Sequence, residues 1–160
     1  CTKCDEWHDD WPAYGFNSPD YHYWLSEEEK EKAELNADFC IVREPDEIHY
    51  FIRAVLIQPV KDRCETLDYG VWTSLGEQNF LDYRENFNNP SHQAQYFGWL
   101  ANKLPDYDND DIQLQIVTRK GSDRPLVFHN QSQNHRLVHD FYRSISLEEA
   151  ERRRVKMLGK

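Results

Sequence analysis

The sequence contains no apolar run that approaches the roughly 20 residues of a membrane-spanning helix. It has only 6 glycines in 160 residues, and none of them falls into the spacing of a phosphate-binding loop. Basic residues are also scarce, since 19 lysines and arginines stand against 29 aspartates and glutamates, for a net charge of −10. Binding to nucleic acid or to an anionic membrane depends on a basic face, so the composition argues against both kinds of partner.

Cysteine is sparse as well, which bears on the cellular compartment. Four cysteines are too few and too unevenly spaced for the framework of a disulfide-rich secreted domain. The sequence also shows no signal-peptide pattern, and we therefore expect a cytoplasmic protein with reduced thiols. A lipid-bearing residue at Cys1 is the alternative, although the pairing of Cys1 with Cys4 accounts for this cysteine better.

What the chain does have is a Cys-x-x-Cys motif formed by Cys1 and Cys4, with His8 shortly after it. This spacing suits two thiolate ligands of one tetrahedral zinc ion, and we predict a structural zinc knuckle with Cys40 as the fourth ligand. The alternative is a reduced N-terminal segment with Cys40 buried as a small hydrophobic residue. A thioredoxin-like redox motif is disfavoured, because the acidic residues around the cysteines would raise the pKa of a thiol.

The rest of the pattern predicts one α+β domain over residues 1–160, with a mostly antiparallel sheet flanked by helices. Residues 1–25 are irregular and aromatic-rich, and residues 26–160 form the α+β core. Capping boxes at Ser26 and Ser146 predict the starts of two helices. The predicted strands cover 39–42, 47–60, 66–74, 112–116 and 125–128, and the predicted helices cover 26–35, 77–87, 91–104 and 147–158.

The helix expected over 91–104 contains an aromatic block, Tyr96-Phe97-Gly98-Trp99-Leu100. Glycine within a helix costs about 1 kcal/mol relative to alanine, so Gly98 indicates the close approach of another backbone or of a bound group. We expect the aromatic side chains of this block to pack mainly into the core, and a pocket wall is the alternative.

Three histidines lie in the C-terminal third, and two of them, His135 and His139, have the i, i+4 spacing of one helix face. That spacing can hold a metal, yet no glutamate stands between them as in a metalloprotease, and no nucleophile elbow accompanies them. We interpret them, together with His129, as surface or helix-capping histidines. The acidic turn that includes Asp106 and Asp108 lacks the glycine and the closing glutamate of a calcium loop, and we interpret it as solvated.

Several short blocks occur in order along the chain: Cys1-x-x-Cys4 with His8, Ser18-Pro19-Asp20-Tyr21, Asp38-x-Cys40-Ile41-Val42, Tyr50-Phe51-Ile52-Arg53, Gly70-Val71-Trp72-Thr73-Ser74-Leu75 with Asn79-Phe80, Tyr96-Phe97-Gly98-Trp99-Leu100, Leu104-Pro105-x-Tyr107, Arg124-Pro125-Leu126, Asn134-His135-x-Leu137 and Ile145-Ser146-Leu147-Glu148. Together they resemble an uncharacterised bacterial family, domain of unknown function 2199. The resemblance extends over essentially the whole chain. It implies a compact bacterial domain, typically cytosolic, without an established activity.

No catalytic constellation stands out, so we favour a non-enzymatic, acidic protein-binding module over an enzyme. A basic protein suits a chain of this charge, and the specific form of the hypothesis is an immunity-type inhibitor that occupies the basic cleft of a bacterial toxin. Asp106 and Asp108 are candidates for contacts with such a partner. The alternative is a small-ligand binder or metal-dependent enzyme with a pocket near Trp72, Trp99 and His135.

Overall fold

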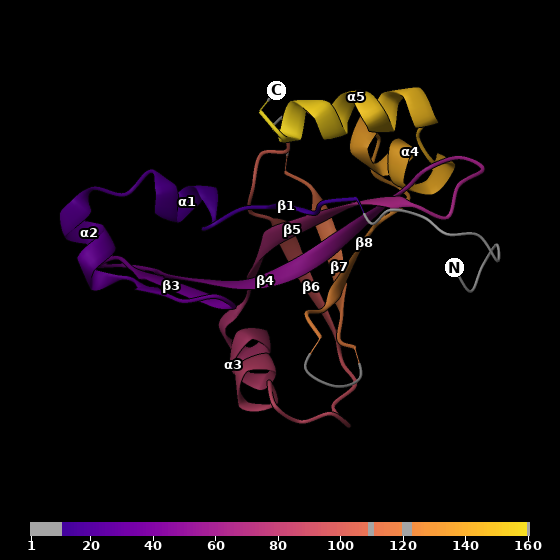
Figure 1. Ribbon diagram of the computed structural model, residues 1–160. Helices are drawn as coiled ribbons and strands as arrows, with labels where there is room; N and C mark the ends of the chain where they lie inside the picture. Colours follow the sequence, from indigo (N-terminus) through magenta and orange to yellow (C-terminus); the bar gives the residue numbers. More distant parts are fainter. Residues whose placement is uncertain (1–10, 109–110, 120–122, 160) are drawn as a thin grey trace.

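The computed structural model describes residues 11–108, 111–119 and 123–159, and within these ranges the strands form a single sheet. Five of the strands close into a barrel, and the helices pack around it (Figure 1). The strands are β1 (Tyr14–Gly15), β2 (Glu34–Leu35), β3 (Phe39–Arg43), β4 (Ile48–Pro59), β5 (Thr66–Leu75), β6 (Gln95–Leu100), β7 (Gln113–Val117) and β8 (Leu126–His129). The helices are α1 (Asp20–Tyr23), α2 (Glu27–Lys32), α3 (Glu77–Glu85), α4 (Arg136–Arg143) and α5 (Leu147–Met157).

The barrel depends on the long strand β4, which pairs antiparallel with β5 along nearly its whole length. The other edge of β4 is shared by two partners: β3 pairs with it as far as Ile52, and β8 runs parallel to it at Val55. The pairs β5–β6, β6–β7 and β7–β8 are antiparallel and complete the barrel. The edge of β4 therefore forks between Ile52 and Val55, where an arm made of β3 and β2 leaves the barrel (Figure 1).

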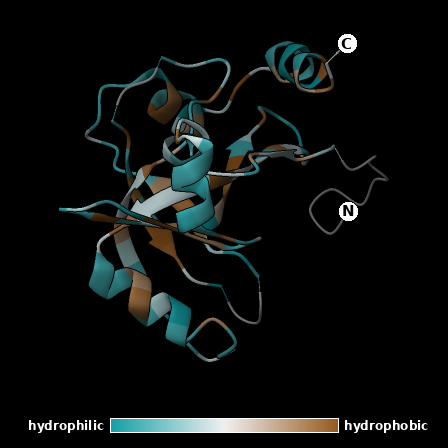
Figure 2. Cartoon of the chain, turned by 90° about the vertical axis from the view of Figure 1, so that its left-hand side faces the viewer, coloured by the Kyte–Doolittle hydropathy of each residue, from teal (hydrophilic) through white to brown (hydrophobic). Residues whose placement is uncertain are grey.

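Alternation of side chains along the strands separates the interior of the barrel from its outer face. In β4, Ile52, Ala54 and Leu56 are fully buried, while the residues between them are partly exposed. Helix α3 covers one end of the barrel, and α4 and α5 cover the other (Figure 1). Apolar residues concentrate on the barrel strands, whereas the helices are largely polar (Figure 2). The barrel interior therefore supplies most of the hydrophobic stabilisation.

The expectation of an α+β fold with a mostly antiparallel sheet is confirmed, and so is the capping box that begins α2. Ser26 Oγ accepts a hydrogen bond from the Glu29 amide at 3.3 Å, and the Glu29 carboxylate accepts one from the Ser26 amide at 2.8 Å. Such a reciprocal pair satisfies two donors that the first turn of a helix leaves free. The predicted strands and the helix over 77–87 also agree with the structure to within a few residues.

The helix predicted over 91–104 is wrong, because residues Gln95–Leu100 form the strand β6. Tyr96 and Gly98 are buried and alternate with the exposed Phe97 and Trp99, which is the period of a strand and not of a helix. The close approach expected at Gly98 is confirmed. A Cβ atom there would lie 2.3 Å from the backbone oxygen of Ser74 in β5, so only glycine allows the two strands to pair at this distance.

The last two helices agree in part with the sequence analysis. Ser146 caps α5, because its Oγ accepts a hydrogen bond from the Glu149 amide at 3.2 Å. Glu149 does not complete a capping box, however, since its carboxylate instead binds Arg153. Helix α4 begins after His135, whose Nδ1 accepts a hydrogen bond from the Leu137 amide at 3.1 Å. The helix-capping interpretation of His135 is therefore confirmed.

Candidate functional site

The residues predicted to bind zinc divide into two groups. Cys1, Cys4 and His8 lie outside the residues that the structure describes. Cys40 lies in β3 and is fully buried among apolar side chains that include Val42. Burial raises the pKa of the Cys40 thiol to about 12, so these surroundings favour the neutral thiol over the thiolate that binds zinc. In the described part of the chain, no three His, Cys, Asp or Glu side chains cluster in a way that could hold a metal ion.

Within the described chain, Trp72, Trp99 and His135 do not line one common pocket. Trp72 is fully buried, and its Nε1 donates a hydrogen bond to the backbone oxygen of Phe16 at 3.0 Å. Trp99 is 38% exposed on the outer face of β6. His135 lines a separate small cavity at the start of α4, as Asp108 also does. The fold therefore gives these three residues different surroundings.

The acidic turn is only partly solvated, which corrects the sequence analysis. Asp106 Oδ1 accepts hydrogen bonds from Arg152 and from Lys156, each at 3.1 Å, and the Asp106 side chain is only 5% exposed. Both partners belong to α5, so this carboxylate ties the turn to the C-terminal helix. Asp108, in contrast, is exposed.

A concavity on the outside of the barrel lies over β4, β5 and β6, next to the start of α3. We call it the β4–β6 groove; it has a volume of about 600 Å³. Three of its side chains are large, apolar and exposed: Ile48 at 43%, Phe97 at 54% and Trp99 at 38%. The rings of Phe97 and Trp99 meet edge to face, with their centroids 5.5 Å apart. Exposed apolar clusters of this kind mark sites of interaction.

Acidic side chains border the β4–β6 groove. Glu47 and Glu77 line it, whereas none of its described lining residues is a lysine or an arginine. The Tyr50 hydroxyl donates a hydrogen bond to Glu77 Oε1 at 2.7 Å, which holds that carboxylate at the groove. His49 Nε2 lies 3.8 Å from Glu47 and 3.6 Å from Glu44. The groove thus combines aromatic walls with a negative rim.

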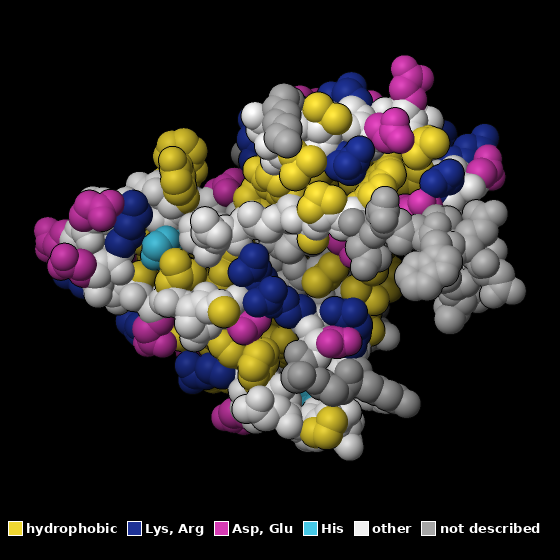
Figure 3. Space-filling view, viewed as in Figure 1, with side chains coloured by type: hydrophobic (Ala, Val, Ile, Leu, Met, Phe, Trp, Pro, Cys, Tyr) yellow, Lys and Arg dark blue, Asp and Glu magenta, His cyan; other side chains and the backbone are white. Residues whose placement is uncertain are grey.

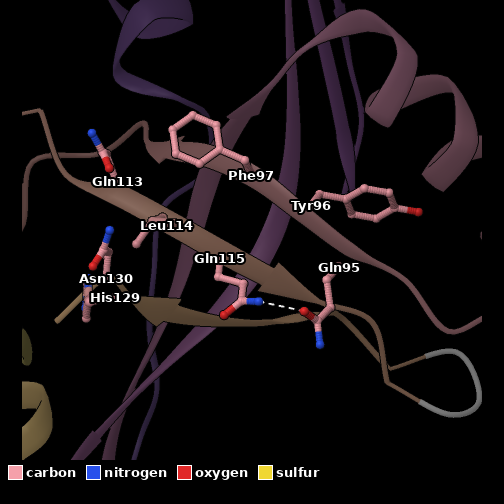
Figure 4. A pocket seen from close by; sticks show the side chains of 8 residues that line it. All are labelled: Gln95, Tyr96, Phe97, Gln113, Leu114, Gln115, His129 and Asn130. Carbon is pink, nitrogen blue, oxygen red and sulfur yellow. Dashed lines mark hydrogen bonds between the residues drawn. The ribbon is translucent and has the colours of Figure 1, made fainter. Parts of the chain in front are cut away.

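A second concavity, of about 480 Å³, lies over β6, β7 and the end of β8 (Figure 4). Phe97 lines both this concavity and the β4–β6 groove. The second concavity is uncharged and rich in amide side chains, and Gln115 Nε2 donates a hydrogen bond to Gln95 Oε1 at 2.6 Å. Its lining consists of Gln95, Tyr96, Phe97, Gln113, Leu114, Gln115, His129 and Asn130.

His129 is the most perturbed histidine of the described chain. Its side chain is 3% exposed, and neither ring nitrogen has a hydrogen-bond partner. Its ring packs edge to face against Phe141, with their centroids 4.9 Å apart. Burial, and to a smaller extent the charge of His135, lowers the pKa of His129 to about 4. The imidazole is therefore neutral at pH 7 and behaves as part of the core, which corrects the interpretation of His129 as a surface or helix-capping histidine.

Replacing His129 by leucine is expected to remove an acid-sensitive part of the protein's stability. The pKa of His129 is about 4 in the folded state and near 6.5 in the unfolded chain, so the unfolded state binds more protons between these values. The free energy of unfolding therefore falls as the pH falls, and at pH 5 the His129 contribution is about 2 kcal/mol lower than at pH 7. Urea denaturation at both pH values measures this difference. Parallel pH profiles for the wild type and His129→Leu would contradict the prediction.

Among the groove residues, the sequence indicated Trp99 as a candidate for contacts but did not indicate Phe97, Ile48 or Glu77, for a specific reason. A helix over 91–104 turns Phe97 and Leu100 toward the core, whereas a strand places Phe97 and Trp99 together on the outer face. The sequence signal that indicates the strand is the period-2 spacing of Gln95, Phe97 and Trp99. Nothing local to Ile48 or Glu77 indicates that they join this surface, because they come from other elements.

Comparison with known proteins yields one match. Residues 1–145 match a family model described as an uncharacterized protein conserved in bacteria, which is domain of unknown function 2199. No curated protein and no solved structure matches the chain. Among the described residues, no helix has the length and apolarity needed to cross a membrane.

Proposed function

The chain belongs to the bacterial family called domain of unknown function 2199, and from this premise we propose that it is a protein-binding module. The β4–β6 groove holds a basic segment of the partner, anchored by an apolar side chain. The observation that carries this proposal is the pair of exposed aromatic rings, Phe97 and Trp99, within a rim of glutamates.

The aromatic pair supplies the binding energy in this proposal. Phenylalanine and tryptophan side chains each bury a large apolar area and contribute strongly to the energetics of protein interfaces. Trp99 and Phe97 stand on a strand of the barrel, paired on both edges with β5 and β7. Their positions are therefore fixed before a partner arrives, which lowers the entropic cost of association.

The acidic rim selects the charge of the partner. Glu47 and Glu77 lie at the groove, and the whole chain carries a net charge of −10. A positively charged partner is attracted over a distance of about 8–10 Å at physiological salt, and opposite charge mainly accelerates association. An acidic or strongly polar segment would lose hydration at the aromatic walls without gaining interactions of equal strength in the groove.

Selection from a displayed library of random peptides tests the proposal without knowledge of the natural partner. Peptides selected on the wild-type protein at low salt are expected to combine lysine or arginine with an aromatic or branched apolar residue. Trp99→Ala is expected to weaken the binding of a synthetic selected peptide by about 30-fold, the effect of losing a central aromatic anchor. Glu47→Gln is expected to weaken it by a few-fold and to reduce its salt dependence. Fluorescence anisotropy measures each affinity.

Trp24→Ala is the matched control, because Trp24 is 78% exposed but lines a different concavity, next to α1. This variant is expected to leave the affinity unchanged. Selection of acidic or uncharged peptides would contradict the proposal, and so would equal losses from Trp24→Ala and Trp99→Ala. Binding that ignores ionic strength would remove the role of the glutamates.

The more specific form of this proposal is an immunity-type inhibitor whose partner is a bacterial toxin with a basic active cleft. The net charge of −10 supports it, since inhibitors of that kind use opposite charge to reach their target rapidly. Co-expression of the chain with a toxin encoded beside it tests this form: protection from toxicity should be lost in Trp99→Ala and kept in Trp24→Ala.

A structural zinc ion at Cys1, Cys4 and His8, with Cys40 as the fourth ligand, is a separate prediction, independent of the groove. Elemental analysis of the purified full chain is expected to find one zinc ion per protein and to lose it in Cys4→Ser. A protein without zinc would overturn this prediction and leave the β4–β6 groove unaffected.

A further inference from the structure

The fork in the edge of β4 carries an arginine, Arg53. Arg53 lies between the part of β4 that pairs with β3 and the part that pairs with β8. Its backbone amide donates a hydrogen bond to the backbone oxygen of Asp38 at 2.9 Å. Its neighbours Ile52 and Ala54 point into the barrel, so the Arg53 side chain lies on the outer face. There it extends over β5 toward β1, where it reaches Gly70 and Gly15.

Arg53 is a cation without a counter-ion in the described chain. No described side chain or backbone group accepts a hydrogen bond from its guanidinium, and its Nε is buried. Arg124, by comparison, donates from Nε to Asp38 at 2.7 Å and from Nη2 to the Ala37 oxygen at 3.2 Å. Burial and the nearby charge of Arg124 lower the pKa of Arg53, against the attraction of Asp38. A partly desolvated cation of this kind is stabilised by an added anion.

Two glycines provide the space that the Arg53 guanidinium occupies. Gly15 in β1 pairs with Gly70 in β5, so the two lie side by side in the sheet. A Cβ atom at Gly15 would lie 2.9 Å from Arg53 Nη2, which is closer than van der Waals contact allows. A Cβ atom at Gly70 would lie 3.5 Å from Nη2, which is an ordinary contact. Gly15 therefore matters more than Gly70 for the position of the guanidinium.

The surroundings of Arg53 are positive although the protein as a whole is acidic. Arg119 Nε donates a hydrogen bond to the Arg124 oxygen at 2.6 Å, which joins a third guanidinium to the group. Among the described residues, two carboxylates, Asp38 and Asp123, are in contact with these three arginines, so one positive charge is left over there. Lysine and arginine side chains gather near the middle of the face shown in Figure 3.

We propose that Arg53, assisted by Arg124, binds the carboxylate of a small organic acid. A carboxylate carries one negative charge, which balances the surplus of the cluster, and its two oxygens match the paired N–H donors at the end of a guanidinium. A phosphate dianion would instead leave a negative excess. Four separate sequence blocks of the family resemblance supply residues to this place: Asp38, Arg53, Gly70 and Arg124. The fold brings these residues together at the fork of β4.

Titration of the full-length protein with sodium acetate, followed through the side-chain N–H resonances of its arginines by NMR, tests the proposal. The Arg53 signal is assigned by its loss in Arg53→Gln. This signal is expected to shift saturably with acetate and to stay in place with sodium chloride at the same ionic strength. Acetate should also raise the melting temperature of the wild type, and not that of Arg53→Gln, because a ligand that binds only the folded state stabilises it.

The two glycines give matched variants that keep every charge. Gly15→Ala is expected to weaken acetate binding at least about fivefold, because the added methyl group displaces the guanidinium, whereas Gly70→Ala should change it less than about twofold. Arg43→Gln, which removes an arginine already paired with Glu34 at 2.6 Å, should leave acetate binding intact. An equal response to chloride, tighter binding of inorganic phosphate than of acetate, or equal effects of the two glycine variants would each overturn the proposal.

Discussion

Replacing Arg153 by methionine is expected to lower the free energy of unfolding by about 3–5 kcal/mol, which is the usual cost of removing one partner from a buried charge network. Arg153 is fully buried although it carries a charge. Its Nε donates to Glu149 at 2.7 Å and its Nη2 donates to Asp140 at 3.0 Å, while its Nη1 donates to the Tyr107 hydroxyl. The network thereby joins α5, α4 and the acidic turn at one end of the barrel.

The variant leaves its partners without their central donor. Asp140 keeps a hydrogen bond from the Tyr107 hydroxyl at 2.8 Å, but its remaining charged neighbour, Arg136, lies 3.8 Å away. The pKa of Glu149 is lowered to about 2, first by its hydrogen bond with Arg152 and then by Arg153. Part of the electrostatic stabilisation of the helix pair is therefore lost together with the packing of the arginine.

Arg152→Met is the control, because Arg152 binds the same Glu149 carboxylate at 2.8 Å but is 51% exposed. The variant also removes the bond from Arg152 to Asp106, whose carboxylate keeps Lys156 at 3.1 Å as a partner. Each ion pair of an exposed arginine contributes about 1 kcal/mol or less, so this variant should cost less than Arg153→Met. Urea denaturation with circular dichroism measures both variants, and Arg153→Met should also lower the melting temperature by roughly 6–20 °C. Similar losses in the free energy of unfolding from Arg152→Met and Arg153→Met would show that burial of Arg153 does not strengthen its interactions.

A second large effect is expected at Gly98, where alanine should destabilise the protein by about 3 kcal/mol. The added methyl group would lie 2.3 Å from the Ser74 oxygen and 2.7 Å from Ile116 Cδ1. The backbone oxygen cannot move without breaking the pairing of β5 with β6, in which Leu75 stands opposite Gly98. The strain therefore falls on the strand that carries the groove aromatics.

Gly76→Ala is the control for Gly98→Ala, since no atom lies within 4 Å of the position that its Cβ would occupy. Gly76 is the N-cap of α3 with a φ of −66°, which alanine adopts without strain, so the loss should stay at about 1 kcal/mol, the cost of alanine as a poorer N-cap. Adding Ile116→Val to Gly98→Ala relieves one of the two clashes and should recover part of the stability. Equal urea midpoints for Gly98→Ala and Gly76→Ala would disprove the close approach.

Much of the fold could be predicted because the corresponding signals are local. The capping box at Ser26 depends on residues three apart, and the alternation over 47–60 and 66–74 reports one buried face of each strand. The block that became β6 was misassigned because its aromatics occupy adjacent positions and fit either period. Neighbouring strands, which a local pattern does not contain, decide between the two.

The sequence by itself determined the acidity of this protein, its mixed helix and strand content, and the capping box that begins α2. Composition and short-range spacing are sufficient for these properties. Closure of the barrel decided the rest: it placed Ile48, Phe97 and Trp99 in one groove and left Arg53 uncompensated at the fork of β4. These surfaces join strands that are distant in sequence, and such contacts depend on the pairing of the whole sheet.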